Sequence, residues 1–426
     1  MLSAPLAAAL ARRDIHYGWV VVAVTFLSML VSAGAVGAPG VLLLPLQREF
    51  GWDTADISTA MAIRLLLFGL MGPFAAAMIN RFGVRRMVLS SLALVGGGLL
   101  ASLAMREVWQ LIVLWGFVVG FGTGLTAMVL GATIATRWFV TRRGLVIGLL
   151  TASSATGQLV FMPLLSMLTE AYGWRTAILL LCGLIAVAAL AMLALMRDRP
   201  ADLGLSAVGE AAGTPPAVAP GAILPAALGA LRDTAATRTF WILFATFFIC
   251  GASTNGLIQT HLIPLCVDFS VPEVQAAGLL ALMGIFDFIG TVGSGWLSDR
   301  YDNRWLLFWY YALRGLSLLY LPYSDFTLYG LSVFAVFYGL DWIATVPPTV
   351  RLTAERFGRE RANLVFGWIF AGHQMGAAAA AFGAGLSRTA LQSYLPAFAI
   401  AGALCLLAAL LVPMLGRSSR PAVAGG

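Results

Sequence analysis

Lysine is absent from this sequence, and all 26 of its basic residues are arginines. Charged residues make up only 11% of the chain, whereas hydrophobic residues make up 60% and the mean hydropathy is +0.90. A polar surface this small cannot keep a chain of 426 residues in solution. The scarcity of charge therefore excludes a soluble globular protein and favours a protein embedded in a lipid bilayer.

Histidine and cysteine are also scarce, with three and four residues respectively. The cysteines lie in or at the ends of apolar segments without metal-ligand spacing, so we interpret them as small packing residues. They are Cys182, Cys250, Cys266 and Cys405. The sequence contains no recognisable nucleotide-binding loop, metal cluster or nucleophile–base set, so we expect neither an enzyme nor a bound cofactor or metal.

Long apolar segments account for most of the chain. A bilayer core about 30 Å thick needs roughly 20 apolar residues for each helical span. Twelve segments meet this requirement, at 17–44, 55–78, 86–105, 108–131, 143–168, 173–196, 240–266, 275–297, 304–322, 327–349, 362–386 and 391–415. We predict that the first segment is retained as an anchor, because it is too long for a cleaved signal peptide.

The sequence repeats itself at a constant offset. Ile263 follows Leu44 by 219 residues (263 minus 44), and Arg300 follows Arg81 by the same number. Duplicated membrane halves are typical of secondary transporters, which carry substrate between the halves. We predict an N-terminal six-helix bundle at 1–197, a linker with a short helix near 222–234 at 198–238, a C-terminal bundle at 239–416 and a tail at 417–426.

The arginines predict the orientation in the membrane. Twenty of them fall in the predicted termini and in the loops between even- and odd-numbered spans, and four fall in the loops on the other side. The positive-inside rule then places both termini in the cytoplasm of a multi-pass inner-membrane protein. The remaining two, Arg64 and Arg314, lie within predicted spans.

The loops after spans 2 and 8 carry related motifs. Gly295, Asp299, Arg300 and Arg304 fit the pattern G-x-x-x-D-R-x-G-x-R, and the first copy keeps Arg81. With twelve spans and a central linker, this motif resembles the major facilitator superfamily, which implies an all-α membrane fold of two pseudo-symmetric six-helix bundles. The resemblance also implies a gating role for Arg81, Asp299, Arg300 and Arg304. The first copy departs from the pattern, with Ala76 and Asn80 where Gly and Asp are usual.

Two further stretches are similar to one branch of that superfamily. The opening HYGWVVVAVTFL with GVLLLPLQREFGW resembles the monocarboxylate transporters, and Trp138-Phe139 with Arg142-Arg143-Gly144 is similar to them and to oxalate/formate antiporters. The resemblance implies transport of a small monocarboxylate with a proton. The position of the first-span lysine of characterised animal members falls at Gly40, and the eighth-span Asp-Arg pair is broken because Thr291 follows Asp287 by one turn.

Three ionisable residues of the second half are predicted to share a depth near the bilayer midplane. Counted at about 1.5 Å per helical residue from the flanking loops, Asp287, Arg314 and Asp341 lie about 15–18 Å deep. A charge at that depth needs a partner or a wet cavity, so we expect Arg314 to pair with Asp287 or Asp341. Arg314 is either a structural ion pair or an anchor for a substrate carboxylate. The two aspartates are candidate proton carriers or permanently ionised struts.

Other polar residues in the spans are candidates for a substrate site. Arg64 is the second intramembrane cation, and His373 is a further candidate for proton coupling because imidazole changes charge near neutral pH. Packing, snorkelling or hydrogen bonding within the bundle are the alternative roles. The remaining candidate substrate contacts are Asn255, Gln259, Gln374 and Tyr338.

These observations lead to one main hypothesis and two alternatives. The main hypothesis is a proton-coupled symporter of a lactate- or pyruvate-like monocarboxylate that works by alternating access. The alternatives are an organic anion antiporter and a non-transporting membrane receptor or sensor. The expected partners are the small organic anion, the proton and the lipid bilayer, with no nucleic acid, and the protein is expected to be monomeric.

Overall fold

The computed structural model describes residues 3–126, 129–210 and 223–416. Helices make up nearly all of this part of the chain, and the single β-bridge within it joins Phe139 to Val208. The prediction of an all-α fold is confirmed. Residues 211–222 of the predicted linker and the predicted tail at 417–426 lie outside the described residues.

The first half of the chain contains a short N-terminal helix, α1, and the helices that correspond to spans 1–6. They are α1 (Ser3–Ala11), α2 (Gly18–Phe50), α3 (Thr54–Phe82), α4 (Val84–Ser102), α5 (Val108–Leu111), a π-helical segment (Ile112–Val119), α6 (Gly120–Gly124), α7 (Val129–Trp138), α8 (Arg143–Tyr172) and α9 (Trp174–Leu195). A short 3₁₀ helix (Pro200–Leu203) follows, and α10 (Ile223–Ala235) is the short helix expected near 222–234.

The second half contains the helices of spans 7–12. They are α11 (Arg238–Gly251), a second π-helical segment (Ala252–Ile258), α12 (Gln259–Asp268), α13 (Glu273–Ser298), α14 (Asn303–Tyr320), a 3₁₀ turn (Leu321–Ser324), α15 (Leu328–Asp341), α16 (Val346–Phe357), α17 (Arg359–Leu391), α18 (Leu395–Leu411) and a last 3₁₀ turn (Val412–Leu415).

Each of the twelve predicted spans coincides with helix. Within the described residues, nine helical stretches are long and apolar enough to cross a bilayer. The other three predicted spans also have helical counterparts, in α5 to α6, in α8 and in α14. Three of the twelve differ from the continuous α-helices predicted: spans 4 and 7 each contain a π-helical segment, and span 10 is interrupted between α15 and α16.

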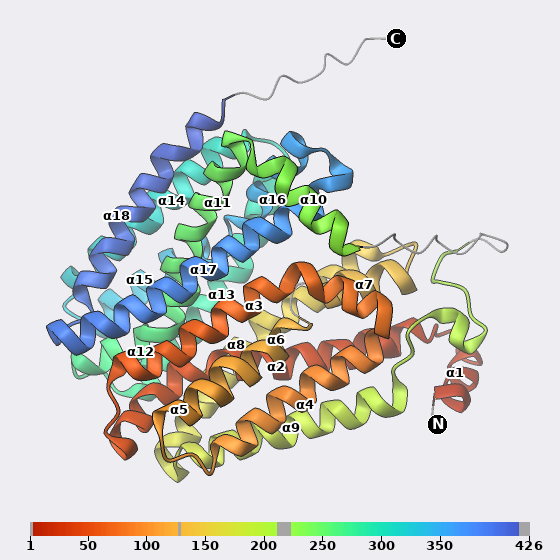
Figure 1. Cartoon of the computed structure of the whole chain (residues 1–426), viewed down its shortest axis with the longest axis horizontal. Helices are drawn as coiled ribbons and strands as arrows, with labels where there is room; N and C mark the ends of the chain where they lie inside the picture. The colour runs from red at the N-terminus through yellow and green to blue at the C-terminus, as the bar shows by residue number, and fades with distance from the viewer. Residues whose placement is uncertain (1–2, 127–128, 211–222, 417–426) are drawn as a thin grey trace.

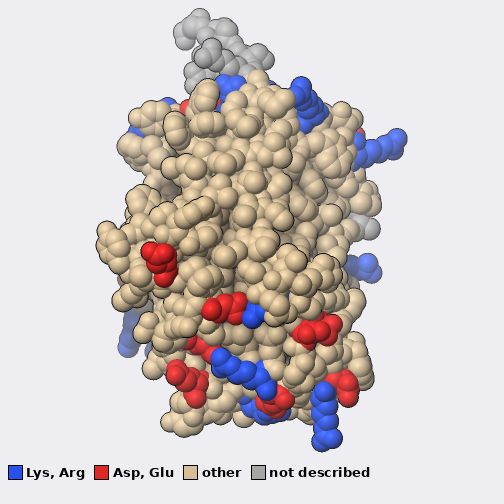
Figure 2. Space-filling model, turned by 90° about the vertical axis from the view of Figure 1, so that its left-hand side faces the viewer, with Lys and Arg blue, Asp and Glu red and all other residues tan. Residues whose placement is uncertain are grey.

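The exposed side chains of α14 show where the lipid lies. Trp305, Trp309, Leu313 and Leu316 are more than half exposed, whereas Arg314 on the other side of the helix is fully buried. Apolar residues on the outer face of a helix suit lipid contact. Figure 2 shows a broad uncharged area on one face of the molecule, with charged side chains gathered toward its lower part.

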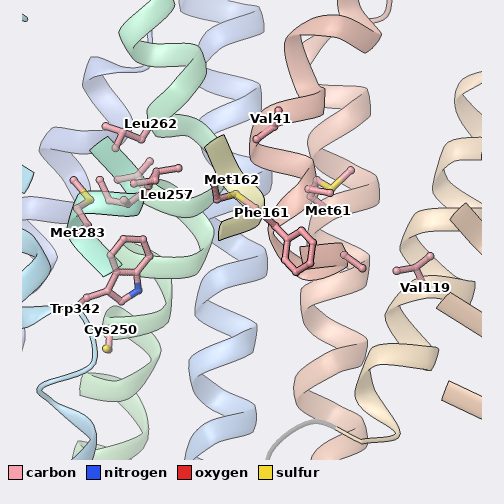
Figure 3. Packing of buried hydrophobic residues seen from close by; sticks show 14 of the residues in the cluster. Val41, Met61, Val119, Phe161, Met162, Cys250, Leu257, Leu262, Met283 and Trp342 are labelled. Carbon is pink, nitrogen blue, oxygen red and sulfur yellow. The ribbon is translucent and has the colours of Figure 1, made fainter. Parts of the chain in front are cut away.

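The two halves of the chain meet along a seam. Figure 1 shows α3 and α17 running side by side between the red-to-yellow and the green-to-blue groups of helices. The helices α13 and α8 pack together across the seam, as do α12 and α2. In Figure 3, Met162 lies between Phe161 and Val41 of the first half and Leu257 of the second. Apolar packing therefore joins the halves through the middle of the molecule.

Close approach of helices in the second half depends on glycine. Any side chain at Gly290 of α13 would collide with the carbonyl oxygen of Leu340 near the end of α15. A side chain at Gly293 would instead enter open space. The end of α15 is therefore held directly against the backbone of α13.

We predict that Gly290→Ala lowers the melting temperature of the detergent-solubilised protein, because overpacking costs about 1–3 kcal/mol. Gly293→Ala, one turn away on the same helix, is the matched control and should be neutral or slightly stabilising, since alanine has the higher helix propensity. Equal melting temperatures for the two variants would contradict this packing.

Candidate functional site

Span 10 is broken near the middle of the molecule. The helix α15 ends at Asp341 and α16 begins at Val346, which leaves residues 342–345 as a turn that we name the span-10 break. Pro347 and Pro348 follow it, and neither has an N–H group that could donate to the carbonyl oxygen four residues earlier. Unpaired backbone groups at membrane depth are costly, so the break needs partners from neighbouring helices.

Arg314 supplies hydrogen bonds to one side of the break. Its Nη2 donates to the carbonyl oxygens of Asp341 and, at 3.0 Å, Trp342. Its Nε donates to Oδ2 of Asp341 at 2.7 Å, and its Nη1 donates to Sγ of Cys250 at 2.9 Å. The predicted pairing of Arg314 with Asp341 is confirmed. Because the guanidinium is fully buried and engaged at all three nitrogens, the arrangement supports the structural alternative for Arg314.

The helix α13 supplies partners to the other side of the break. Oδ1 of Asp287 accepts hydrogen bonds from the backbone N–H of Ile343 at 2.8 Å and from the hydroxyl of Thr291 at 3.1 Å. The hydroxyl of Ser294 donates to the carbonyl oxygen of Ala344 at 2.5 Å. This carbonyl is the one that the missing N–H of Pro348 leaves free. Asp287 and Ser294 thus replace helical hydrogen bonds that the break removes.

Arg64 is the second buried arginine, and its surroundings are different. Its side chain is 4% exposed, and its Nη1 donates to the carbonyl oxygen of Val36 in α2 at 2.7 Å. Its Nε has no hydrogen-bond partner, and no carboxylate lies within ion-pair distance among the described residues. A buried guanidinium with spare donors can bind an anion.

Two glutamines lie where α2 and α3 meet the second half. The backbone of Gln259 lies against Gly40, and the side chain of Gln374 lies against Gly69. Both glutamines are buried; Nε2 of Gln259 and Oε1 of Gln374 have no hydrogen-bond partner within the described structure. One unpaired donor and one unpaired acceptor therefore lie on the seam between the halves.

His373 lies next to Gln374 and is surrounded by aromatic rings. Its ring is 4.8 Å from that of Phe247 and stacks on Phe370 at 5.6 Å, measured between centroids. Phe370 in turn contacts Phe68 of α3 across the seam at 6.1 Å. Nδ1 of His373 has no partner among the described residues. We name Arg64, Gln259, Gln374 and His373, with their unpaired polar atoms, the polar seam.

The other two predicted substrate contacts, Tyr338 and Asn255, form hydrogen bonds within span 7 or to it. The hydroxyl of Tyr338 donates to the carbonyl oxygen of Ser253 at 2.7 Å and so fixes the π-helical segment of span 7. Asn255 in that segment is half-buried, and its carbonyl oxygen accepts from the hydroxyl of Thr260 at 2.9 Å. Neither residue presents an unpaired buried polar atom. Cys250 and Ser294 were not among the predicted site residues, since only the fold brings them to the break.

The predicted gating residues make contacts within their own halves. Asp299 forms an ion pair with Arg351, and Arg304 pairs with Asp302 at 2.6 Å. The guanidinium of Arg300 lies 4.0 Å from the ring centroid of Trp296. The guanidinium of Arg81 lies 5.5 Å from the ring of Phe82. We name the side that carries these residues the arginine-rich end.

The opposite end joins the two halves. Arg48 at the end of α2 forms an ion pair with Glu273 at the start of α13 at 2.6 Å, and the backbone N–H of Ala55 donates to the hydroxyl of Thr389 at 3.1 Å. Among the ion pairs of the described residues, Arg48–Glu273 is the one that links the helices of spans 1–6 to those of spans 7–12. The opposite end is therefore tied across the seam.

Comparison with known proteins identifies the family. The family profile described as the Major Facilitator Superfamily matches residues 25–381 and 268–425. The chain belongs to the Major Facilitator Superfamily. It is therefore a membrane transporter rather than an enzyme, and the predicted fold class is confirmed.

Curated relatives within the superfamily include monocarboxylate transporters. The chain is 27% identical to monocarboxylate transporter 13 of Rattus norvegicus over 396 residues, which cover 92% of this chain and 87% of that one. It is 24% identical to an uncharacterized MFS-type transporter, YcxA, of Bacillus subtilis over 361 residues, which cover 83% and 84%. The predicted resemblance to monocarboxylate transporters is confirmed.

A solved structure shows the same fold. A bacterial homolog of the human lysosomal transporter Spinster, described as inward-facing and occupied, superposes with a TM-score of 0.71 at 15% identity, covering 93% of this chain and 96% of that one. At this low identity the superposition shows that the two proteins share a fold.

We predict that Arg314→Gln prevents stable folding of the transporter. The change leaves a buried carboxylate and two buried carbonyl oxygens without their donor, and breaking a buried pair costs about 3–5 kcal/mol. Size-exclusion chromatography and thermal melting in detergent measure the effect. Arg304→Gln is the control, because its ion pair with a partly exposed partner contributes about 0–1 kcal/mol. A folded, inactive Arg314→Gln protein would show that Arg314 is a substrate anchor.

Proposed function

We propose that this transporter carries a small monocarboxylate together with a proton by alternating access of its two halves, residues 1–197 and 239–416. The observation that carries this proposal is Arg64, a buried guanidinium with an unpaired Nε and no carboxylate partner among the described residues. The similarity to monocarboxylate transporters over most of the chain supports the same substrate class.

Arg64 and Gln259 are the proposed contacts for the substrate carboxylate. An arginine side chain donates two parallel hydrogen bonds to a carboxylate and stays charged at any relevant pH. The unpaired Nε2 of Gln259 adds a donor from the second half. Arg314 is the less suitable anchor, because all three of its nitrogens already donate to Asp341, Trp342 and Cys250. A substrate held at the polar seam would contact both halves of the transporter.

His373 is the proposed proton carrier. Its Nδ1 is unpaired next to Gln374 and is an atom that can take a proton. Asp287 and Asp341 are the alternative carriers, but both carboxylates already hold the span-10 break through Ile343 and Arg314. Protonation of Asp341 would weaken its ion pair with Arg314.

Alternating access requires the contacts between the halves at the end opposite the arginine-rich end to open when the substrate site faces that end. These contacts are the ion pair Arg48–Glu273 and the hydrogen bond from Ala55 to Thr389. Because positive residues favour the cytoplasmic side, we propose that the arginine-rich end and both termini face the cytoplasm, with the protein in the inner membrane. The structure would then be closed toward the outside.

We expect the purified protein in liposomes to accumulate labelled lactate or pyruvate when an inward proton gradient is imposed, and a protonophore should abolish the accumulation. Exchange in preloaded vesicles without accumulation would favour an anion antiporter instead. Vesicles that show neither signal for any small monocarboxylate would contradict the proposed substrate class.

In the same vesicles, Arg64→Gln should lower uptake by roughly tenfold or more, because a hydrogen bond to a charged group contributes about 1.5–3 kcal/mol. Arg64→Lys keeps the charge but loses the planar fork, so it should raise KM more than it lowers the maximal rate. Both variants should fold, as judged by their melting temperatures. Wild-type uptake by Arg64→Gln would exclude Arg64 from the site.

A further inference from the structure

A cavity of about 660 Å³ lies at the arginine-rich end, within the first half of the chain and away from the seam. The ends of α3, α7 and α9, the start of α4 and the segment after α9 enclose it. Its charged lining residues are Arg81, Arg85, Arg86, Arg137, Arg199, Asp198 and Asp202. Five arginines and two aspartates leave it strongly positive.

Local structure fixes the cavity wall. Gly83 has a positive φ of 87°, and a side chain there would collide with the carboxylate of Asp198. That carboxylate accepts a hydrogen bond from the backbone N–H of Arg85 at 2.9 Å, and Nη2 of Arg85 donates to the carbonyl oxygen of Leu193 at 2.5 Å. The start of α4 is thereby tied to the end of α9, and the cavity lies between them.

The two aspartates do not neutralise the arginines. Oδ2 of Asp202 accepts from the backbone N–H groups of Asp198 and Arg199, each at 3.1 Å. None of the ion pairs in the described structure involves Arg86 or Arg199, and Nε of Arg85 is buried without a hydrogen-bond partner. Burial and the charge of Arg199 lower the pKa of Arg137, and the opposing effect of Asp198 and Asp202 is smaller. An anion in the cavity would relieve this crowding of positive charge.

One wall of the cavity is apolar and exposed. Phe82 and Leu193 are 45% and 50% exposed, and Leu89 lies beside them. These residues terminate or begin membrane helices, so they lie at the boundary between lipid and water. A water-soluble phosphate compound has no apolar group to pack against this wall, whereas a lipid has acyl chains that can cover it.

We propose that this cavity binds the phosphate headgroup of an anionic phospholipid, with the acyl chains against Phe82, Leu89 and Leu193. Basic pockets between membrane helices suit such headgroups, and arginine forms strong bidentate bonds with phosphate. The bound lipid would join the ends of α3, α4 and α9. The site is separate from the polar seam and does not rest on the proposed transport function.

Native mass spectrometry of the full-length transporter in mild detergent, titrated with phosphatidylglycerol, tests the proposal. Removing two arginines from near an anionic headgroup should weaken binding by at least roughly tenfold in Arg86→Gln/Arg199→Gln. The matched control, Arg232→Gln/Arg300→Gln, removes two exposed arginines of the same end that do not line the cavity, and it should bind the lipid as the wild type does.

Three results would overturn the proposal. Equal weakening in the two double variants would show that overall surface charge attracts the lipid. Equally tight binding of phosphatidylcholine would show that the site does not select an anion. Displacement of the lipid by inorganic phosphate at similar concentration would assign the cavity to a free phosphate compound.

The single variants keep the proposal testable if the pocket double variant does not fold. Arg86→Gln and Arg199→Gln alone should each weaken lipid binding about threefold, and unchanged binding in both would also overturn the proposal.

Discussion

The span-10 break is the constraint on which the arrangement of the second half depends. A turn at membrane depth leaves polar backbone groups that lipid cannot satisfy. Arg314 satisfies carbonyl oxygens on one side, while Asp287 and Ser294 satisfy an N–H and a carbonyl on the other. These contacts join four neighbouring elements, since Arg314 also binds Cys250 of α11. Charged residues that look functional in a hydrophobic sequence are thus accounted for as replacements for lost helical hydrogen bonds.

This assignment determines where transport chemistry remains available. With Arg314 engaged, Arg64 is the arginine of the two within the predicted spans that retains an unpaired donor. Gln259 and Gln374, which come from the other half of the chain and lie against α2 and α3, also carry unpaired atoms. A ligand bound among them would contact both halves, which is the requirement for coupling occupancy to their relative motion. In the proposed function, the break supplies rigidity and the seam supplies the substrate contacts.

Much of the fold was predictable from the sequence, because the length of the apolar segments and the 219-residue repeat can be read directly from the chain. That Arg314 would pair with Asp287 or Asp341 was also predictable, since all three lie near one depth, but the choice of Asp341 needed the structure. The interruption of span 10 was signalled by Pro347-Pro348 but not recognised. The partners of the break were beyond sequence reasoning, because Cys250 and Ser294 are ordinary small residues until packing brings α11 and α13 beside it.

The most direct test of this account compares His373→Gln with Asp287→Asn in proteoliposomes, measuring gradient-driven accumulation and exchange on the same preparations. The asparagine oxygen can still accept from Ile343 and Thr291, so Asp287→Asn should fold and accumulate substrate as the wild type does. His373→Gln should lose accumulation but keep exchange, because it cannot take a proton. Loss of accumulation in Asp287→Asn with normal accumulation in His373→Gln would contradict the account and make the break itself the site of proton coupling.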